Sequence, residues 1–202
     1  MEGFNKLFFF GILAMALVCT GTAYADSPTD QLKLSIDQIL DVLRDPELKA
    51  EDKKEARREI LRQIARQRFD YRKMSERSLG KYVKGKTEAE MEAFTALFTT
   101  LVEDSYMGKI ESYTDEDVVF LKERIKKKKQ RQYAKINTKI VTETVEIPID
   151  YMMYKSGTAP WMVYDMIIEG VSMVSNYRSQ FGDILERDSF ATLIQKLKDK
   201  KD

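Results

Sequence analysis

Histidine is absent from the 202-residue sequence, and the single cysteine, Cys19, lies in an apolar N-terminal run. The chain beyond that run therefore has no thiol and no imidazole. This excludes disulfides, thiol nucleophiles, histidine general bases and the commonest kind of zinc site. The 34 basic and 33 acidic residues leave a formal net charge of only +1, so long-range attraction to nucleic acid is not predicted. We expect no metal site and no catalytic cysteine or histidine.

The N-terminus has the pattern of a secretory signal peptide. Lys6 precedes an apolar run over residues 7–18, which is short for a membrane span, and Ala23-Tyr24-Ala25 provides small residues where a signal peptidase needs them. Lipid modification at Cys19 is the alternative, but the bulky Val18 disfavours it. We expect residues 1–25 to be removed and residues 26–202 to form a single secreted domain without an internal linker.

Apolar spacing predicts an α+β fold, with helices first and a sheet afterwards. Residues recurring at three- and four-residue steps predict helices behind Ser27-Pro28 as far as Pro46, over 51–68 and 70–82, and from Thr87 to about 110. Alternating patterns then predict four strands, over 118–125, 132–142, 145–155 and 161–168, followed by helices over 172–187 and 189–198. A block of helices followed by a meander favours an antiparallel sheet over a parallel one.

The basic run over residues 126–131 falls between the first two predicted strands. Its simplest interpretation is a solvated hairpin turn, and the alternative is a contact with a membrane surface or a partner.

The second half of the chain is unusually rich in aromatic residues and methionine. Residues 152–154 and 162–168 are almost continuously apolar, so both faces of these strands must be covered by helices or by a ligand. Methionine adapts to irregular partners such as a lipid chain. An ordinary packed core is the alternative to an apolar pocket.

Three charged residues lie within these apolar segments. Asp150 and Asp165 each neighbour a tyrosine, an arrangement that fits either an acid/base pair in an apolar pocket or hydrogen-bonded anchors between strand and helix. Arg178 is a candidate for pairing with a phosphate at a pocket mouth or for acting as the buried partner of an aspartate.

Several motifs resemble the MlaC-like proteins, also called toluene-tolerance or organic-solvent-resistance auxiliary proteins, of Gram-negative lipid transport. Tyr82 and Met162 depart from the family pattern. The matching motifs cover most of the chain after the first helices: Phe69-Asp70-Tyr71, Met74, Leu79-Gly80, Tyr106-Met107-Gly108-Lys109-Ile110, Tyr113, Ile147-Pro148-Ile149-Asp150-Tyr151, Trp161-Met162-Val163-Tyr164-Asp165, Ile168-Glu169-Gly170-Val171-Ser172 and Asn176-Tyr177-Arg178-Ser179-Gln180-Phe181.

The resemblance implies a helical layer on a curved four-stranded antiparallel sheet, similar to nuclear-transport-factor-like and cystatin-like folds, with an apolar pocket between the layers. It implies a monomeric periplasmic carrier without a cofactor or catalytic residues. Such a carrier holds a phospholipid as cargo, shuttles it between an outer-membrane MlaA-porin complex and an inner-membrane MlaFEDB-type ABC transporter, and maintains outer-membrane lipid asymmetry.

Apolar positions within the family-like segments supply the candidate lipid-binding residues, with Arg178 as a candidate headgroup or structural residue. Carriage of a hopanoid or another apolar lipid, a pocket enzyme of the same fold and a structural adaptor without a cavity remain alternatives. The candidates are Leu97, Phe98, Leu101, Tyr106, Ile140, Tyr151, Met153, Val163, Tyr164, Ile168, Val171, Val174 and Tyr177.

Overall fold

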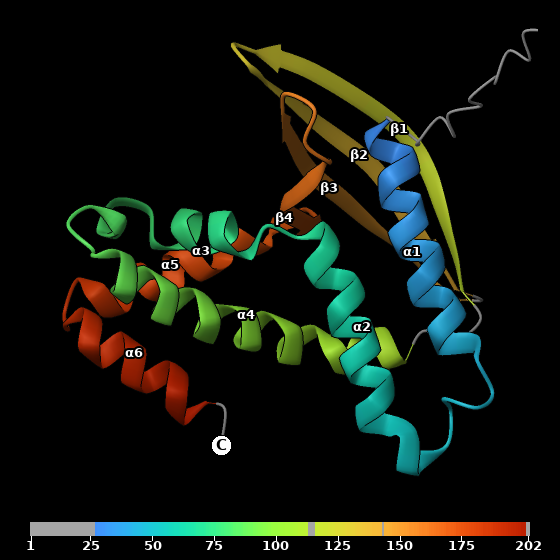
Figure 1. Cartoon of the computed structure of the whole chain (residues 1–202), viewed down its shortest axis with the longest axis horizontal. Helices are drawn as coiled ribbons and strands as arrows, with labels where there is room; N and C mark the ends of the chain where they lie inside the picture. The colour runs from blue at the N-terminus through green and yellow to red at the C-terminus, as the bar shows by residue number, and fades with distance from the viewer. Residues whose placement is uncertain (1–26, 113–115, 143, 201–202) are drawn as a thin grey trace, which may run out of the picture.

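The computed structural model describes residues 27–112, 116–142 and 144–200, so the predicted signal peptide and Tyr113 lie outside the described residues. The chain folds into helices followed by an antiparallel sheet and two closing helices (Figure 1), which confirms the predicted fold class. The helical elements are α1 Pro28–Arg44, η1 Glu51–Lys53, α2 Lys54–Arg68, α3 Tyr71–Leu79, η2 Gly80–Val83, α4 Glu88–Glu111, α5 Met173–Leu185 and α6 Phe190–Asp199. The strands are β1 Asp117–Lys128, β2 Arg131–Val141, β3 Glu146–Ser156, β4 Met162–Ile168 and β5 Val171–Ser172.

Short polar side chains fix where the helices begin. The hydroxyl of Ser27 accepts a hydrogen bond from the Asp30 N–H at the start of α1, and the carboxylate of Asp70 accepts one from the Lys73 N–H at the start of α3. The predicted capping box at α4 is confirmed: Thr87 and Glu90 each accept a backbone hydrogen bond from the other. Each such cap satisfies a helix N–H that has no partner within the helix.

The sheet is an open antiparallel meander in the order β1-β2-β3-β4-β5. The two-residue strand β5 makes the count five rather than the predicted four. Two irregularities interrupt the alternation of side chains: the pairing skips Leu121 in β1 and Tyr164 in β4. Because an extra residue reverses the faces of the residues beyond it, these bulges decide which side chains face the helices.

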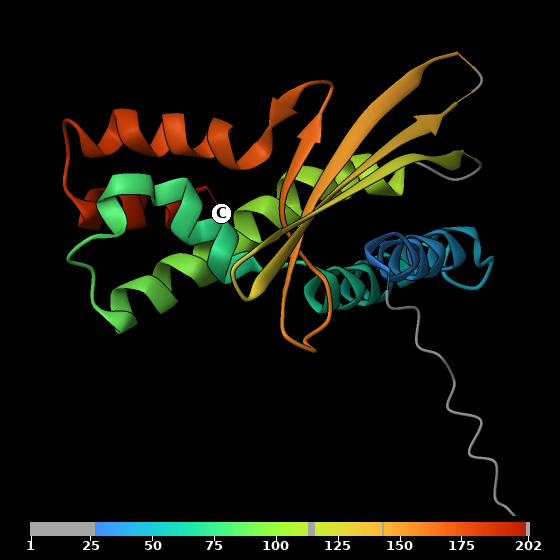
Figure 2. The ribbon, with the colours of Figure 1, turned by 90° about the horizontal axis from the view of Figure 1, so that it is seen from above.

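The helices form two groups that share α4. Figures 1 and 2 show α1 and α2 side by side against the sheet, whereas α3, α5 and α6 gather around the N-terminal half of α4. A buried cluster that includes Phe94, Phe98 and Phe181 fills the second group. A smaller cluster, with Leu32 of α1 and Val163 of β4, joins α1 to the sheet. None of the helices in the described ranges is long and apolar enough to span a membrane.

Candidate functional site

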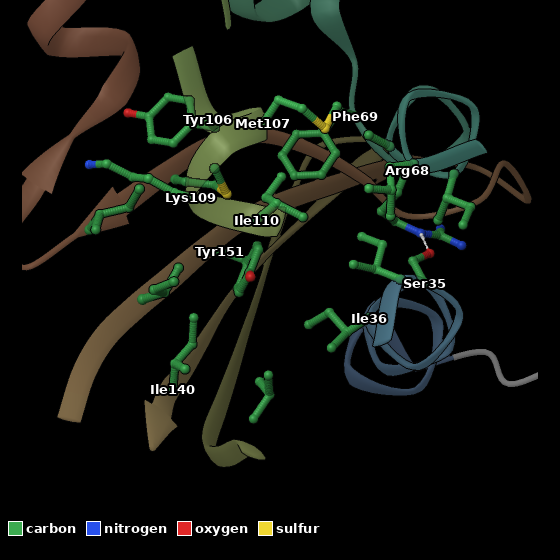
Figure 3. A pocket seen from close by; sticks show the side chains of 18 of the residues that line it. Ser35, Ile36, Arg68, Phe69, Tyr106, Met107, Lys109, Ile110, Ile140 and Tyr151 are labelled. Carbon is green, nitrogen blue, oxygen red and sulfur yellow. Dashed lines mark hydrogen bonds between the residues drawn. The ribbon is translucent and has the colours of Figure 1, made fainter. Parts of the chain in front are cut away.

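An apolar cavity of about 470 Å³ lies between α1, α2, the C-terminal part of α4 and one face of the sheet (Figure 3). This volume is within the range of roughly 300–1,000 Å³ usual for small-molecule pockets. The cavity therefore separates the two layers where a conventional core would join them.

The helical wall of the cavity arises from amphipathic stripes. In α1 the apolar residues recur every three or four positions, so one face of the helix turns toward the sheet. A comparable stripe on α2 and the C-terminal part of α4 complete this wall, although the apolar residues of α4 are spread around the helix because both helix groups pack against it. The apolar lining from these three helices consists of Leu32, Ile36, Ile39, Leu40, Leu43, Leu61, Ile64, Ala65, Val102, Tyr106, Met107 and Ile110.

The sheet wall follows the two-residue period of a strand. Ile147, Ile149 and Tyr151 alternate along β3 and line the cavity, and Ile140 of β2 lies opposite Ile147. On β4 the lining residues are Met166 and Ile168, and on β1 the lining residue is Val118.

Tyr151 points into this space from the middle of β3 (Figure 3). Burial raises the pKa of its hydroxyl to about 12, because the surroundings disfavour the phenolate. A neutral tyrosine at physiological pH keeps this part of the lining compatible with apolar cargo.

Polar residues of the lining are mostly paired with other protein groups. Arg68 donates hydrogen bonds to the Ser35 hydroxyl (3.0 Å), the Gln31 side chain (2.9 Å) and the Trp161 carbonyl (2.7 Å), which tie α2 to α1 and to the start of β4. Burial lowers the pKa of its guanidinium. The buried carboxylate of Glu103 accepts two hydrogen bonds from Arg66, at 2.9 and 2.8 Å.

The remaining polar lining residues follow the C-terminal part of α4 and the matching end of the sheet. Lys109 lies in the last turn of α4, Ser112 caps the C-terminus of that helix, Glu116 directly precedes β1, and Glu169 directly follows β4. In an antiparallel meander, the start of β1 and the end of β4 lie at the same end of the sheet. One end of the cavity is therefore more polar than its middle.

Of the residues predicted to bind lipid, Tyr106, Ile140, Tyr151 and Ile168 line this cavity. Their contact with a lipid stays a prediction. Most of the others lie in packed regions: Phe98, Val174 and Tyr177, together with Leu97 and Leu101, in the cluster around α4, and Met153 and Val163 beneath α1.

Two further predicted lipid-binding residues, Tyr164 and Val171, lie neither in the cavity nor in these packed clusters. Tyr164 packs against the rings of Tyr133 and Tyr154, with the Arg77 guanidinium 4.8 Å from its ring centre. Val171 is 61% exposed on β5. Neither residue belongs to the cavity lining.

The two aspartates have structural partners and do not line the cavity. Asp165 is buried and accepts hydrogen bonds from the Ser172 hydroxyl (2.7 Å) and the Val174 N–H (3.0 Å), so it fixes the start of α5 to β4. Asp150 pairs with Lys135 at 2.7 Å and accepts a hydrogen bond from Asn137. The geometry of Asp165 matches the interpretation as an anchor between strand and helix, whereas Asp150 links β3 to the neighbouring strand β2.

Arg178 pairs with neither aspartate. Its Nε donates to the Arg77 carbonyl at 2.8 Å, and its side chain passes over Gly80, where a Cβ would come within 3.3 Å of it. Gly80 also has a positive φ of 57°, which favours glycine there. The arginine thus connects α5 to the end of α3 and lies outside the cavity lining.

We expect Asp165→Ala to lower the free energy of unfolding by about 2–3 kcal/mol, because one buried donor and one partly buried donor lose a charged acceptor. Asp150→Ala is the matched control and should cost less than about 1 kcal/mol, because its ion pair is partly exposed. Urea denaturation measures both values. Equal losses in the two variants would contradict the role of Asp165 as the anchor of α5.

Comparisons with known proteins agree on one family. A family model described as MlaC protein matches residues 33–199. A relative from Haemophilus influenzae, the intermembrane phospholipid transport system binding protein MlaC, is 28% identical over 122 residues, which span 59% of this chain and 56% of that protein.

A solved structure shares the fold. It is a phospholipid-binding protein from Ralstonia solanacearum in complex with a phospholipid, which aligns with a TM-score of 0.75 at 20% identity and covers 85% of this chain and 95% of that chain. The family model extends over most of the sequence, from α1 to α6. This protein therefore belongs to the MlaC family.

Proposed function

We propose that this protein is a periplasmic carrier that holds a glycerophospholipid by its acyl chains and performs no chemistry on it. The observation that carries the proposal is the cavity of about 470 Å³ with an apolar lining between helices and sheet. The names of the Haemophilus and Ralstonia relatives, which refer to phospholipid transport and phospholipid binding, support the same ligand class.

The physical need for such a carrier follows from the cost of exposing acyl chains to water. Each methylene contributes about 0.8 kcal/mol, so a two-chain lipid with roughly 30 methylenes meets a barrier on the order of 20 kcal/mol when it crosses water unaided. A cavity lined by aliphatic and aromatic side chains replaces the membrane interior for these chains. We propose that the headgroup lies at the more polar end, near Lys109 and Glu169.

Residues 1–25, as a cleaved signal peptide, would deliver a monomeric carrier to the periplasm. We propose that it moves phospholipid between an outer-membrane MlaA-porin complex and an inner-membrane MlaFEDB-type transporter, and so supports outer-membrane lipid asymmetry. Tight burial also slows spontaneous release. Docking on a membrane complex is therefore expected to open the cavity by moving a helix against the sheet.

α1 is the helix best suited to this movement. It supplies five apolar residues to the cavity lining, and apart from the packing of Leu32 and Ile36 against β2 and β4, only a few polar contacts within the described residues tie it to the sheet. These include the Thr29 N–H and hydroxyl bonded to Glu123 of β1, at 3.1 and 2.5 Å, and the Gln31 side chain bonded to the Trp161 N–H at 3.0 Å. Such hydrogen bonds can be exchanged for water at modest net cost.

An uptake experiment distinguishes a carrier from a pocket enzyme. Delipidated protein is incubated with phospholipid vesicles and separated from them, and the bound lipid is extracted and identified by mass spectrometry. A carrier returns chemically unchanged phospholipid in a fixed ratio to protein. Hydrolysed or rearranged lipid would contradict the proposal, as would a protein that takes up no lipid.

A further inference from the structure

The far end of the β1–β2 hairpin has a concentration of charge that the lipid cavity does not use. Residues 122–131 contain seven basic residues and one acidic residue, so they carry a net charge of +6 in a chain whose total is +1. The remaining residues therefore sum to −5. The hairpin extends beyond the helices at this end (Figure 1), and every residue of β1 from Leu121 to Lys128 is exposed.

The bulge at Leu121 arranges these charges on one face. Beyond it, Glu123 and Ile125 lie opposite the buried residues Ile136 and Ala134 and share their face, the one covered by α1. The alternate positions therefore fall on the opposite face, and each of them is basic: Lys122, Arg124, Lys126 and Lys128. At about 3.4 Å per residue, this row spans roughly 20 Å.

Within the described part of the chain, no carboxylate neutralises this row. Lys122, Arg124 and residues 126–129 form no ion pair there, whereas the neighbouring lysines of β2, Lys135 and Lys139, pair with Asp150 and Glu146. The nearby acidic residue Glu123 is engaged by Thr29 on the other face. The cations of β1 are therefore available to bind an external anionic partner.

An open depression lies at the tip of the hairpin, between the β1–β2 turn and the β3–β4 turn. Its lining includes Lys127, Lys129, Arg131 and Ser156. Three cations and a hydroxyl around one depression match the chemistry of a phosphate group.

We propose that this hairpin docks the protein on an anionic phospholipid membrane surface. Flexible lysines on both faces of the two-residue turn suit a diffuse layer of phosphates. The membrane-facing end is about ten residues of strand away from Val118 and Ile140 of the cavity lining. Docking here leaves the polar end of the cavity free.

Vesicle sedimentation tests the proposal with the mature, lipid-loaded protein. Vesicles of phosphatidylcholine alone are compared with vesicles of equal parts phosphatidylcholine and phosphatidylglycerol, at low and high salt. We expect binding to the anionic vesicles that is at least about tenfold stronger than to the neutral ones and is suppressed by salt. Equal binding to both kinds of vesicle, or no binding, overturns the proposal.

Two charge-matched variants locate the site. Replacing Lys126, Lys127, Lys128 and Lys129 with glutamine should reduce anionic-vesicle binding at least about tenfold, while the lipid content stays unchanged. The control replaces the exposed lysines Lys49, Lys53, Lys196 and Lys198 with glutamine and should bind as the unaltered protein does. An equal loss in the control, or full binding by the hairpin variant, would show that the hairpin is not the docking site. Because lipid content is measured separately, failure of this proposal is distinguishable from failure of the carrier function.

Discussion

Replacing Tyr151 with glutamate is expected to reduce the bound phospholipid at least about tenfold. Tyr151 lies in the middle of the sheet wall and points into the cavity (Figure 3). A carboxylate at this position must either be desolvated against an acyl chain or bring water into the cavity, and both outcomes cost several kcal/mol, where 1.4 kcal/mol already equals a tenfold loss in affinity. Lipid extracted from equal amounts of purified protein gives the measurement.

Val171→Glu is the matched control for this change. Val171 was an equal candidate on sequence grounds, but it is 61% exposed on β5 and does not line the cavity. We expect its lipid content and stability to be unchanged. Normal lipid content in a folded Tyr151→Glu variant would remove Tyr151 from the binding site.

A second variant covers the case in which Tyr151→Glu does not fold. Ile140→Trp places a larger apolar side chain in the lining without adding charge, so it should reduce lipid content by filling space. If this variant folds, as circular dichroism would show, and still holds a full complement of lipid, the cavity is not where the acyl chains bind.

A covalent link between α1 and β1 is expected to slow lipid exchange at least about tenfold, because it prevents the opening movement on which release depends. Thr29 and Glu123 are already in contact, and the mature chain would have no cysteine of its own. Thr29→Cys and Glu123→Cys can therefore be joined selectively by a short bismaleimide. Transfer of fluorescent phospholipid between vesicles reports the exchange rate.

The control link joins two helical elements away from the cavity. Lys81 and Glu186 form an exposed ion pair at 3.7 Å, and a Lys81→Cys, Glu186→Cys pair joined by the same reagent should exchange lipid at the normal rate. The unlinked Thr29→Cys, Glu123→Cys protein should also behave normally. Fast exchange by the linked α1–β1 protein would show that α1 does not move to release the lipid.

The helices and the four long strands can be predicted from the sequence because each one has a local signal. Ser27, Asp70 and Thr87 cap helices close to where the apolar spacing begins, and Pro46 follows directly after the first helix has ended. The alternating strands and the turn within the basic run were likewise predicted to within a few residues. The short strand β5 was not predicted, since two residues are too few to show a period.

The site was harder to predict because apolar stripes are the same whether they face a core or a cavity. The stripe of Leu32, Ile36, Ile39, Leu40 and Leu43 predicts a helix, but nothing in it distinguishes a cavity wall from a packed interface. The residues of α4 that are predicted to bind lipid show the opposite case, because some of them lie in a packed core. Phe98 and Leu101 pack near α5 and α6, whereas Tyr106 lies farther along the same helix and reaches the cavity.

The bulge in β4 explains why Tyr164, which the sequence predicts to bind lipid, does not line the cavity. Simple alternation would put Tyr164, Met166 and Ile168 on one face, but the extra residue at Tyr164 places Val163 and Met166 on the same side, opposite Met153 and Tyr151. A bulge depends on pairing with the neighbouring strand, so the sequence of β4 alone does not reveal it. Arg178 is a similar case, because its bond to the Arg77 carbonyl depends on the packing of α5 against α3.

Native mass spectrometry of the mature protein, purified without detergent, tests the carrier function most directly. We expect a protein that carries a stoichiometric adduct with the mass of a phospholipid, which Tyr151→Glu loses and Val171→Glu retains. A ligand-free protein that also refuses phospholipid from vesicles would contradict the carrier function and favour a structural adaptor or a pocket enzyme instead.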